Sequence, residues 1–165
     1  MPSLAHLYDA HAPALFAFAL DLTRSEADTA DILQEIFCRL AARPELLRGV
    51  RDERAFLLRM VYTRVVDASR RRAVRQRFAD EADPAALFAP AADPDENAFR
   101  ESLAHALAEL PADQRAVVHL KLWQGLTFDE IATALRIPAN TAASRYRYGL
   151  DKLRTLLRPL YEEIQ

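Results

Sequence analysis

The segment Leu110–Leu156, LPADQRAVVHLKLWQGLTFDEIATALRIPANTAASRYRYGLDKLRTL, decides the fold of this chain. Thr127 and Glu130 have the spacing of a capping box, which predicts a helix over 128–135. Pro138 restricts the residue before it to extended geometry, so that helix ends there. A second helix is expected to begin at Asn140 or Thr141 and to continue to about residue 157. The segment therefore predicts a helix-turn-helix.

The predicted last helix carries hydrogen-bond donors suited to nucleic acid. These donors are Thr141, Ser144, Arg145, Arg147, Tyr148 and Lys152. A groove-reading helix places its N-terminal residues at base edges, so we expect the first three there and Arg147 and Lys152 at phosphates. The predicted buried side is Ala142, Tyr146 or Gly149, Leu150, Leu153 and Leu156. A solvated basic helix in an ordinary bundle is the alternative, but the capped helix and the proline break favour DNA.

Three further helices are expected toward the N-terminus, over residues 3–22, from the Ser25–Asp28 cap to Pro44, and from Asp52 or Glu53 onward. The third of these ends in a basic run. Its residues 59–77 include seven arginines and a single acid, which is a pattern typical of contact with a nucleic-acid backbone. The segment 46–51 before it could reach an unstacked base. A solvated helix face is the alternative reading of such a charge run.

The second helix carries an acidic-polar face, made of Asp28, Asp31, Gln34 and Glu35. Acids near a helix start are favourable through the helix dipole alone. An arginine-bearing protein surface is the functional alternative.

A change of composition divides the chain. Residues 79–97 are rich in Ala, Pro and acid and contain no basic residue, which predicts a flexible acidic linker. We therefore expect an all-α protein with two small helical domains, over residues 1–78 and 98–165, joined by that linker. A fourth helix is expected from Phe99 to Leu110, and a fifth through Val117 to Trp123.

Composition excludes several classes of function. The chain of 165 residues has a net charge of −2 and one cysteine, Cys38, so no intramolecular disulfide can form and a reducing cytoplasm is expected. The N-terminus does not resemble a signal peptide, and no stretch approaches the length of a membrane span. The histidines lack metal-ligand spacing, and the three glycines are too far apart for a phosphate loop. We expect no cofactor, no metal and no enzymatic activity. Cys38, Trp123 and Phe128 are expected to be buried in the core.

Taken together, these segments resemble a known family. DILQEIFCRLAARPE resembles the core-polymerase-binding helix of bacterial sigma factors, and FLLRMVYTRVVDASRRR resembles their promoter-melting helix. LAELPADQRAVVHLKLWQGLTFDEIATALRIPANTAASRYRYGLDKLR resembles their C-terminal helix-turn-helix domain. The chain is similar over essentially its whole length to the short extracytoplasmic-function (ECF) group of the sigma-70 family, with the linker matching only in position and character.

The resemblance implies a protein that binds core RNA polymerase and directs it to promoter DNA. Polymerase contact would fall to Asp31, Gln34, Glu35 and Phe37. The non-template strand of the −10 element would be captured by the loop 46–54 and the helix after it, through Arg48, Arg51, Phe56, Arg59, Thr63, Asp67, Arg70 and Arg71. The −35 element would receive the last helix in its major groove. Control by an anti-sigma factor is a further expectation of the family.

Some residues depart from the family pattern. Arg136 stands in the turn where glycine is usual, and Ala142 and Ala143 replace an apolar-plus-basic pair. Phe56 and Thr63 stand where Trp and Asn are frequent. Two alternative functions remain: a sigma-like decoy that sequesters an anti-sigma factor, and a helix-turn-helix regulator that is not a sigma factor. The regulator would normally need a dimer to read two half-sites.

Overall fold

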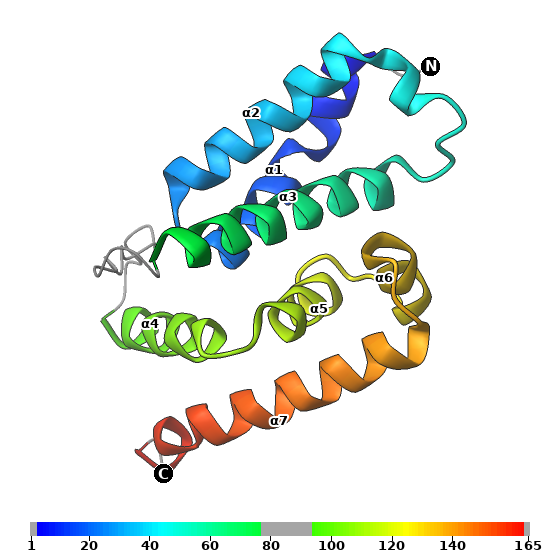
Figure 1. The fold of residues 1–165 in the computed structure, drawn as a ribbon. Helices are drawn as coiled ribbons and strands as arrows, with labels where there is room; N and C mark the ends of the chain where they lie inside the picture. The colour runs from blue at the N-terminus through cyan, green and yellow to red at the C-terminus, as the bar shows by residue number, and fades with distance from the viewer. Residues whose placement is uncertain (1–2, 77–93, 164–165) are drawn as a thin grey trace.

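The computed structural model describes residues 3–76 and 94–163, which form seven α-helices and one short 3-10 helix (Figure 1). The expected linker over 79–97 lies outside the described residues up to residue 93, and its residues 94–97 belong to a helix. In chain order the elements are α1 (Leu4–Thr23), α2 (Glu26–Ala42), η1 (Pro44–Leu47), α3 (Glu53–Gln76), α4 (Pro94–Ala108), α5 (Ala112–Leu122), α6 (Phe128–Leu135) and α7 (Ala139–Glu163).

Short polar side chains start the N-terminal helices, as the sequence predicts. The Ser3 hydroxyl accepts from the amide of His6, and the Ser25 hydroxyl accepts from the amide of Asp28. The carboxylate of Asp52 accepts from the Ala55 amide at 2.9 Å and so opens α3. Each of these bonds satisfies an amide that the helix itself leaves unpaired.

The helix-turn-helix is formed by α6, its turn and α7. The capping box of Thr127 and Glu130 is complete in both directions, which confirms the prediction. Arg136 ends α6 in the left-handed conformation, with φ 54°. The carbonyl of Pro138 then accepts from the amides of Thr141 and Ala142, so α7 begins at Ala139, slightly before the expected start, and it also runs beyond residue 157. The turn is fixed by backbone bonds rather than by a side-chain cap.

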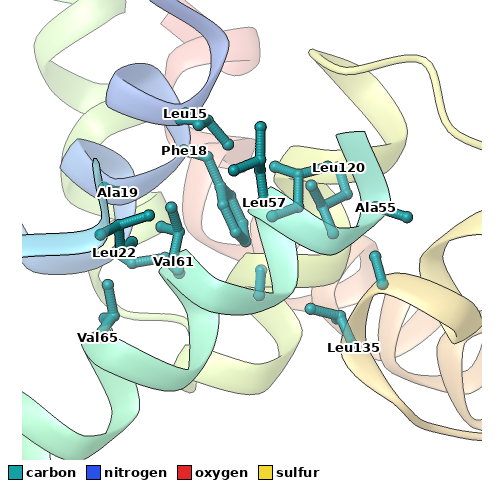
Figure 2. Close-up of a cluster of buried hydrophobic side chains, with 14 of the residues drawn as sticks. Leu15, Phe18, Ala19, Leu22, Ala55, Leu57, Val61, Val65, Leu120 and Leu135 are labelled. Carbon is teal, nitrogen blue, oxygen red and sulfur yellow. The ribbon is translucent and has the colours of Figure 1, made fainter. Parts of the chain in front are cut away.

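The helices form two units that lie face to face (Figure 1). We call α1–α3 the N-terminal unit and α4–α7 the C-terminal unit. Apolar side chains of both units belong to one continuous core, in which Phe18 of α1, Leu57 of α3 and Leu120 of α5 are fully buried. Figure 2 shows side chains of α1 and α3 converging with Leu120 and Leu135 of the C-terminal unit. The two predicted domains therefore share an interior.

A second, smaller core lies within the C-terminal unit, where α7 packs on α4 and α5. It includes Leu107, Val118, Leu153 and Leu157. Gly149 of α7 sits directly against α5, so close that a Cβ there would lie 2.8 Å from the Cγ2 atom of Val118. A side chain at this position would therefore require Val118 to shift, whereas the nearest backbone atom of α5, the Gln114 carbonyl oxygen, would lie 3.8 Å from the Cβ, at ordinary contact distance.

Three burial predictions were wrong. Trp123 is half exposed because it is the C-cap of α5, where the helix turns away from the core. Cys38 is exposed on α2, one position past the buried stripe of that helix. On α7 the stripe continues to Leu157 rather than to the exposed Leu156. Phe128, by contrast, is partly buried against the core, edge-on to Tyr146. None of the described helices is long and apolar enough to cross a membrane.

Candidate nucleic-acid and polymerase interfaces

The N-terminal half of α7 presents the predicted base-reading residues. Thr141, Ser144 and Arg145 are half-buried, and the Ser144 hydroxyl donates to the Asn140 carbonyl at 2.9 Å. Further along, Arg147 and Tyr148 are exposed, with the guanidinium 5.1 Å from the ring centroid. That cation–π contact pre-orients a cation on the solvent face.

Two of the predicted DNA contacts on α7 are engaged by the protein itself. Arg145 Nε lies 3.2 Å from Asp113 Oδ2, on the first turn of α5. Lys152 Nζ donates to the Glu109 carbonyl at 2.6 Å, just beyond the end of α4, where a cation complements the helix dipole. Both side chains are solvent-accessible, and such bonds contribute little to stability, so phosphates can compete for these donors.

The predicted −10 residues follow α3 and the segment before it. Thr63, Arg70 and Arg71 are exposed on α3, and Arg48 and Arg51 are exposed between η1 and α3. Gly49 has a φ of 78°, which lets the chain turn sharply between these two arginines.

The remaining −10 residues, Phe56, Arg59 and Asp67, are half-buried. The Arg59 guanidinium lies 5.2 Å from the centroid of the Phe56 ring. Partial burial lowers the pKa of Arg59, and the nearby positive charge of Arg136 lowers it further. An anion beside Arg59 would therefore relieve an existing repulsion.

On α2, three of the four predicted polymerase contacts are exposed. Asp31 and Gln34 face solvent, and Glu35 forms an ion pair with Arg64 of α3. Phe37 is the buried one of the four. Its ring lies edge-on to Tyr8, with 5.0 Å between the centroids. It lines the floor of a surface groove.

That groove, of about 480 Å³, lies between α1 and α2 and was missed by sequence reasoning. Leu4, Tyr8 and Phe16 of α1 line it together with Leu33 and Phe37 of α2. The sequence signal for the groove is Tyr8, an aromatic residue at helical spacing from Leu4. In the folded chain the Tyr8 side chain is half exposed.

A smaller cleft joins residues that were predicted for different tasks. It has a volume of about 110 Å³ and lies between α2 and α3. Glu35, predicted for polymerase, lines it together with Arg59 and Thr63, predicted for the −10 strand. Arg39 and Arg64 also line it and were not singled out from the sequence. Across residues 3–76 and 94–163, no cluster of His, Cys, Asp or Glu is arranged to hold a metal ion.

Comparisons with known proteins place both halves of the chain in one family. The sigma-70 region 2 family model matches residues 7–75, and the sigma-70 region 4 model matches residues 100–153. The ECF RNA polymerase sigma factor SigL of Mycobacterium tuberculosis is 35% identical over 158 residues, covering 93% of this chain and 88% of the relative. The ECF RNA polymerase sigma factor SigX of Bacillus subtilis is 30% identical, covering 96% of this chain and 85% of the relative.

A solved structure shows the same fold. It is the sigma factor RpoE from Bartonella quintana in complex with the anti-sigma factor NepR, which aligns with a TM-score of 0.75 and 22% identity over 88% of this chain and 91% of that one. These matches confirm the resemblance found in the sequence and the all-α fold. The chain therefore belongs to the ECF group of RNA polymerase sigma factors.

Proposed function

We propose that the chain binds core RNA polymerase and directs promoter-specific initiation of transcription. The observation that carries this proposal is the separation of charge between elements. From Glu26 to Glu35 the exposed charges of α2 are all acidic, whereas exposed arginines lie along α3, and Arg147 lies exposed on α7 before the first exposed acid of that helix, Asp151. A protein that joins an arginine-bearing protein surface to two stretches of DNA needs this separation, because an acid among the phosphate contacts would oppose binding.

Each surface has a chemically distinct task in this proposal. Asp31, Gln34 and Glu35 would bind polymerase, with Phe37 supporting them from the groove beneath. The −35 duplex would receive α7, with Thr141, Ser144 and Arg145 at base edges and Arg147, Tyr148 and Lys152 along the backbone. A sequence-reading helix in the major groove uses this division of contacts.

The −10 element would be held as a separated strand. Phe56 could stack an unstacked base, which contributes about 1–3 kcal/mol per base. Arg48, Arg51, Arg59, Arg70 and Arg71 would follow the phosphates, and Thr63 and Asp67 would offer hydrogen bonds to base edges. The corresponding division is residues 1–78 for polymerase and −10 binding, a linker that begins at residue 79 and ends before α4 starts at Pro94, and the rest of the chain for −35 binding.

Binding to polymerase also implies where the chain acts and how it is regulated. We place the chain in the cytoplasm, where polymerase and template meet, and assign it no catalytic step of its own. An anti-sigma factor is its expected regulator, since the similar Bartonella protein was solved with one.

The decisive experiment is transcription by core polymerase on a library of genomic fragments, with and without this chain. We expect RNA that depends on the chain, and a shared promoter sequence among the productive fragments. Absence of chain-dependent RNA from every fragment would reject the proposal and favour the decoy. Binding to duplex as a dimer, without polymerase, would favour the ordinary regulator.

Matched variants assign the surfaces. Asp31→Ala should weaken association with core polymerase, whereas Glu101→Ala, an exposed acid on α4, should not. Arg147→Ala should weaken binding to the −35 duplex by the same factor for all sequences, since it removes a phosphate contact. The slope of the logarithm of the binding constant against the logarithm of the salt concentration should become shallower by about one. Arg158→Ala, at the far end of the same helix, is its control.

A further inference from the structure

The cleft between α2 and α3 gathers more positive charge than its own acid neutralises. Three arginines line it against a single acid: Arg39 and Glu35 of α2, and Arg59 and Arg64 of α3. On α2, Glu35 and Arg39 are four residues apart and therefore lie on one face of the helix. On α3, Arg59 and Thr63 have the same spacing. Three positive charges and one negative charge give the cleft a net charge of +2.

The acid pairs with only one of the three guanidinium groups. Glu35 forms its ion pair with Arg64. Arg59 lies over the ring of Phe56, a contact that leaves its charge without a carboxylate. Within residues 3–76 and 94–163, the Arg39 guanidinium forms no hydrogen bond and no ion pair, and its side chain is exposed. Two of the three positive charges are therefore available to an anion.

Arg64 also has a donor that the protein does not use. Its Nη2 atom donates to Oε2 of Glu35, whereas its Nε–H is shielded from solvent and has no acceptor in the described part of the chain. A shielded donor without an acceptor is unfavourable, because it has lost its bond to water and gained none in return. The apolar side chains of Ile36 and Met60 line the same cleft, and an apolar surrounding strengthens the attraction between charges. An anion rich in oxygen would supply the missing acceptor.

Size and charge together define the class of ligand. At about 110 Å³ the cleft is much smaller than the roughly 300–1,000 Å³ of pockets that enclose whole small molecules, so it suits a single group. The cations are all arginines, whose planar forks bind phosphate oxygens through paired, charge-assisted hydrogen bonds. Two unneutralised guanidinium groups offer more donors than one carboxylate can accept. Phosphate, with its several oxygens, fits this donor set.

We propose that the α2–α3 cleft is a phosphate-binding site, in which Arg39 and Arg64 join Arg59 in holding one phosphate group. This inference rests on the proposed function to the extent that Arg59 and Thr63 belong to the surface proposed for the −10 strand. It extends that surface onto α2, the helix otherwise proposed for polymerase. Glu35 holds Arg64 until the phosphate binds. A DNA strand and a free phosphate-bearing molecule share this chemistry, and the test separates them.

The test titrates the full chain, without polymerase, with two probes: a short single-stranded DNA and inorganic pyrophosphate. Low salt is used because phosphate contacts weaken steeply as salt rises. Arg39→Gln should weaken binding about tenfold, since it removes a charged donor from the phosphate. Arg43→Gln is the matched control. Arg43 is exposed at the C-cap of α2, four residues beyond Arg39, and does not line the cleft. The control should bind like the wild type.

A spectroscopic signal locates the phosphate. In nitrogen–hydrogen correlation spectra, the Nε–H signal of Arg64 is identified as the one that disappears in Arg64→Lys. It should shift when a probe binds, because this donor gains an acceptor. Arg64→Lys keeps the charge but lacks the fork, so it should bind about tenfold more weakly. A surface that attracts anions only through its overall charge would not distinguish lysine from arginine.

Glu35→Gln tests the role of the acid. It frees Arg64 and removes a charge that repels phosphate, so binding should become about two- to fivefold tighter. Circular dichroism checks that each variant retains its helix content. Should Arg64→Lys lose helix, Arg39→Gln still decides the outcome, because Arg39 is exposed and unpaired in the described part of the chain.

The two probes distinguish the sources of phosphate. Binding of the strand without competition from pyrophosphate assigns the cleft to a DNA phosphate, and displacement of the strand by pyrophosphate assigns it to a free phosphate-bearing ligand; either result supports the site. The proposal is overturned if neither probe binds, if Arg39→Gln and Arg43→Gln have equal effects, or if the Arg64 signal does not move. Phosphate binding without chain-dependent RNA would leave the site standing and reject the proposed function. Chain-dependent RNA with a cleft that ignores both probes would reject the site alone.

Discussion

Substituting Gly149 by alanine tests the closest helix contact in the C-terminal unit. The new Cβ would lie 2.8 Å from Val118 Cγ2, whereas carbon atoms normally approach to about 3.5–4.0 Å. Val118 is fully buried and β-branched, so it cannot rotate away at little cost. Either α7 moves outward or the valine leaves its rotamer, and both responses disturb the core of α5 and α7.

Two opposing effects set the magnitude. Overpacking a core costs about 1–3 kcal/mol. Replacing glycine by alanine inside a helix returns about 1 kcal/mol through helix propensity. We therefore expect Gly149→Ala to lower the free energy of unfolding by about 1 kcal/mol, within a range from about zero to 2. Val118→Ala removes the atom that clashes, so in that background Gly149→Ala should raise stability by up to about 1 kcal/mol.

A double-mutant cycle in urea separates the two effects. Unfolding of the wild type, both single variants and the double variant is followed by circular dichroism, with the slope of the transition checked for constancy. The coupling energy between the two sites should be about 1–3 kcal/mol. Equal effects of Gly149→Ala in both backgrounds, with coupling below about 0.5 kcal/mol, would show that the helices adjust freely and that glycine is not required there.

Three further substitutions probe the same framework. Arg115→Met should cost about 3 kcal/mol in urea denaturation, because several buried carbonyls lose a charged donor; a change within 0.5 kcal/mol would contradict this role. Thr127→Ala should cost about 1 kcal/mol at neutral pH. Hydrogen bonds from Thr127 lower the pKa of Glu130, so the stabilisation by the capping box is present above the carboxyl pKa of the unfolded chain and is lost as the pH falls through the pKa of the folded chain. In thermal melts from neutral to acid pH, the melting temperature of the variant should therefore fall less than that of the wild type. Equal falls in melting temperature for the two proteins would exclude this linkage. Arg136→Gly should raise the free energy of unfolding by about 1 kcal/mol, and with it the melting temperature, because glycine adopts the left-handed conformation without strain. A lower melting temperature than that of the wild type would mean that the arginine side chain has a stabilising partner.

Local signals in the sequence predicted the helix starts and the helix-turn-helix. The Ser25 and Thr127 caps depend on residues three positions apart, so the sequence contains all the information that they need. The family resemblance predicted which helices carry which task. The left-handed conformation of Arg136 follows from the resemblance, because the family usually has glycine at this place in the turn.

Tertiary features were beyond such reasoning. Apolar residues of α1 and α3, such as Phe18 and Val61, have the same helical spacing whether they pack within their own unit or against the other one. The engagement of Lys152 with the Glu109 carbonyl depends on how α4 and α7 cross. The resemblance implies a polymerase contact for Phe37, but its packing against Tyr8 depends on the angle between α1 and α2.

The shared core of Phe18, Leu57 and Leu120 has a consequence for engineering hybrids. Exchanging the promoter-reading halves of two relatives is a natural way to build a regulator with a new specificity. In this chain such a graft would join two surfaces whose shapes were never fitted to each other, and closely packed interiors tolerate little mismatch in volume. The hybrid would expose apolar side chains whenever polymerase is scarce, so its solubility in the free state, rather than its promoter contacts, would limit its use.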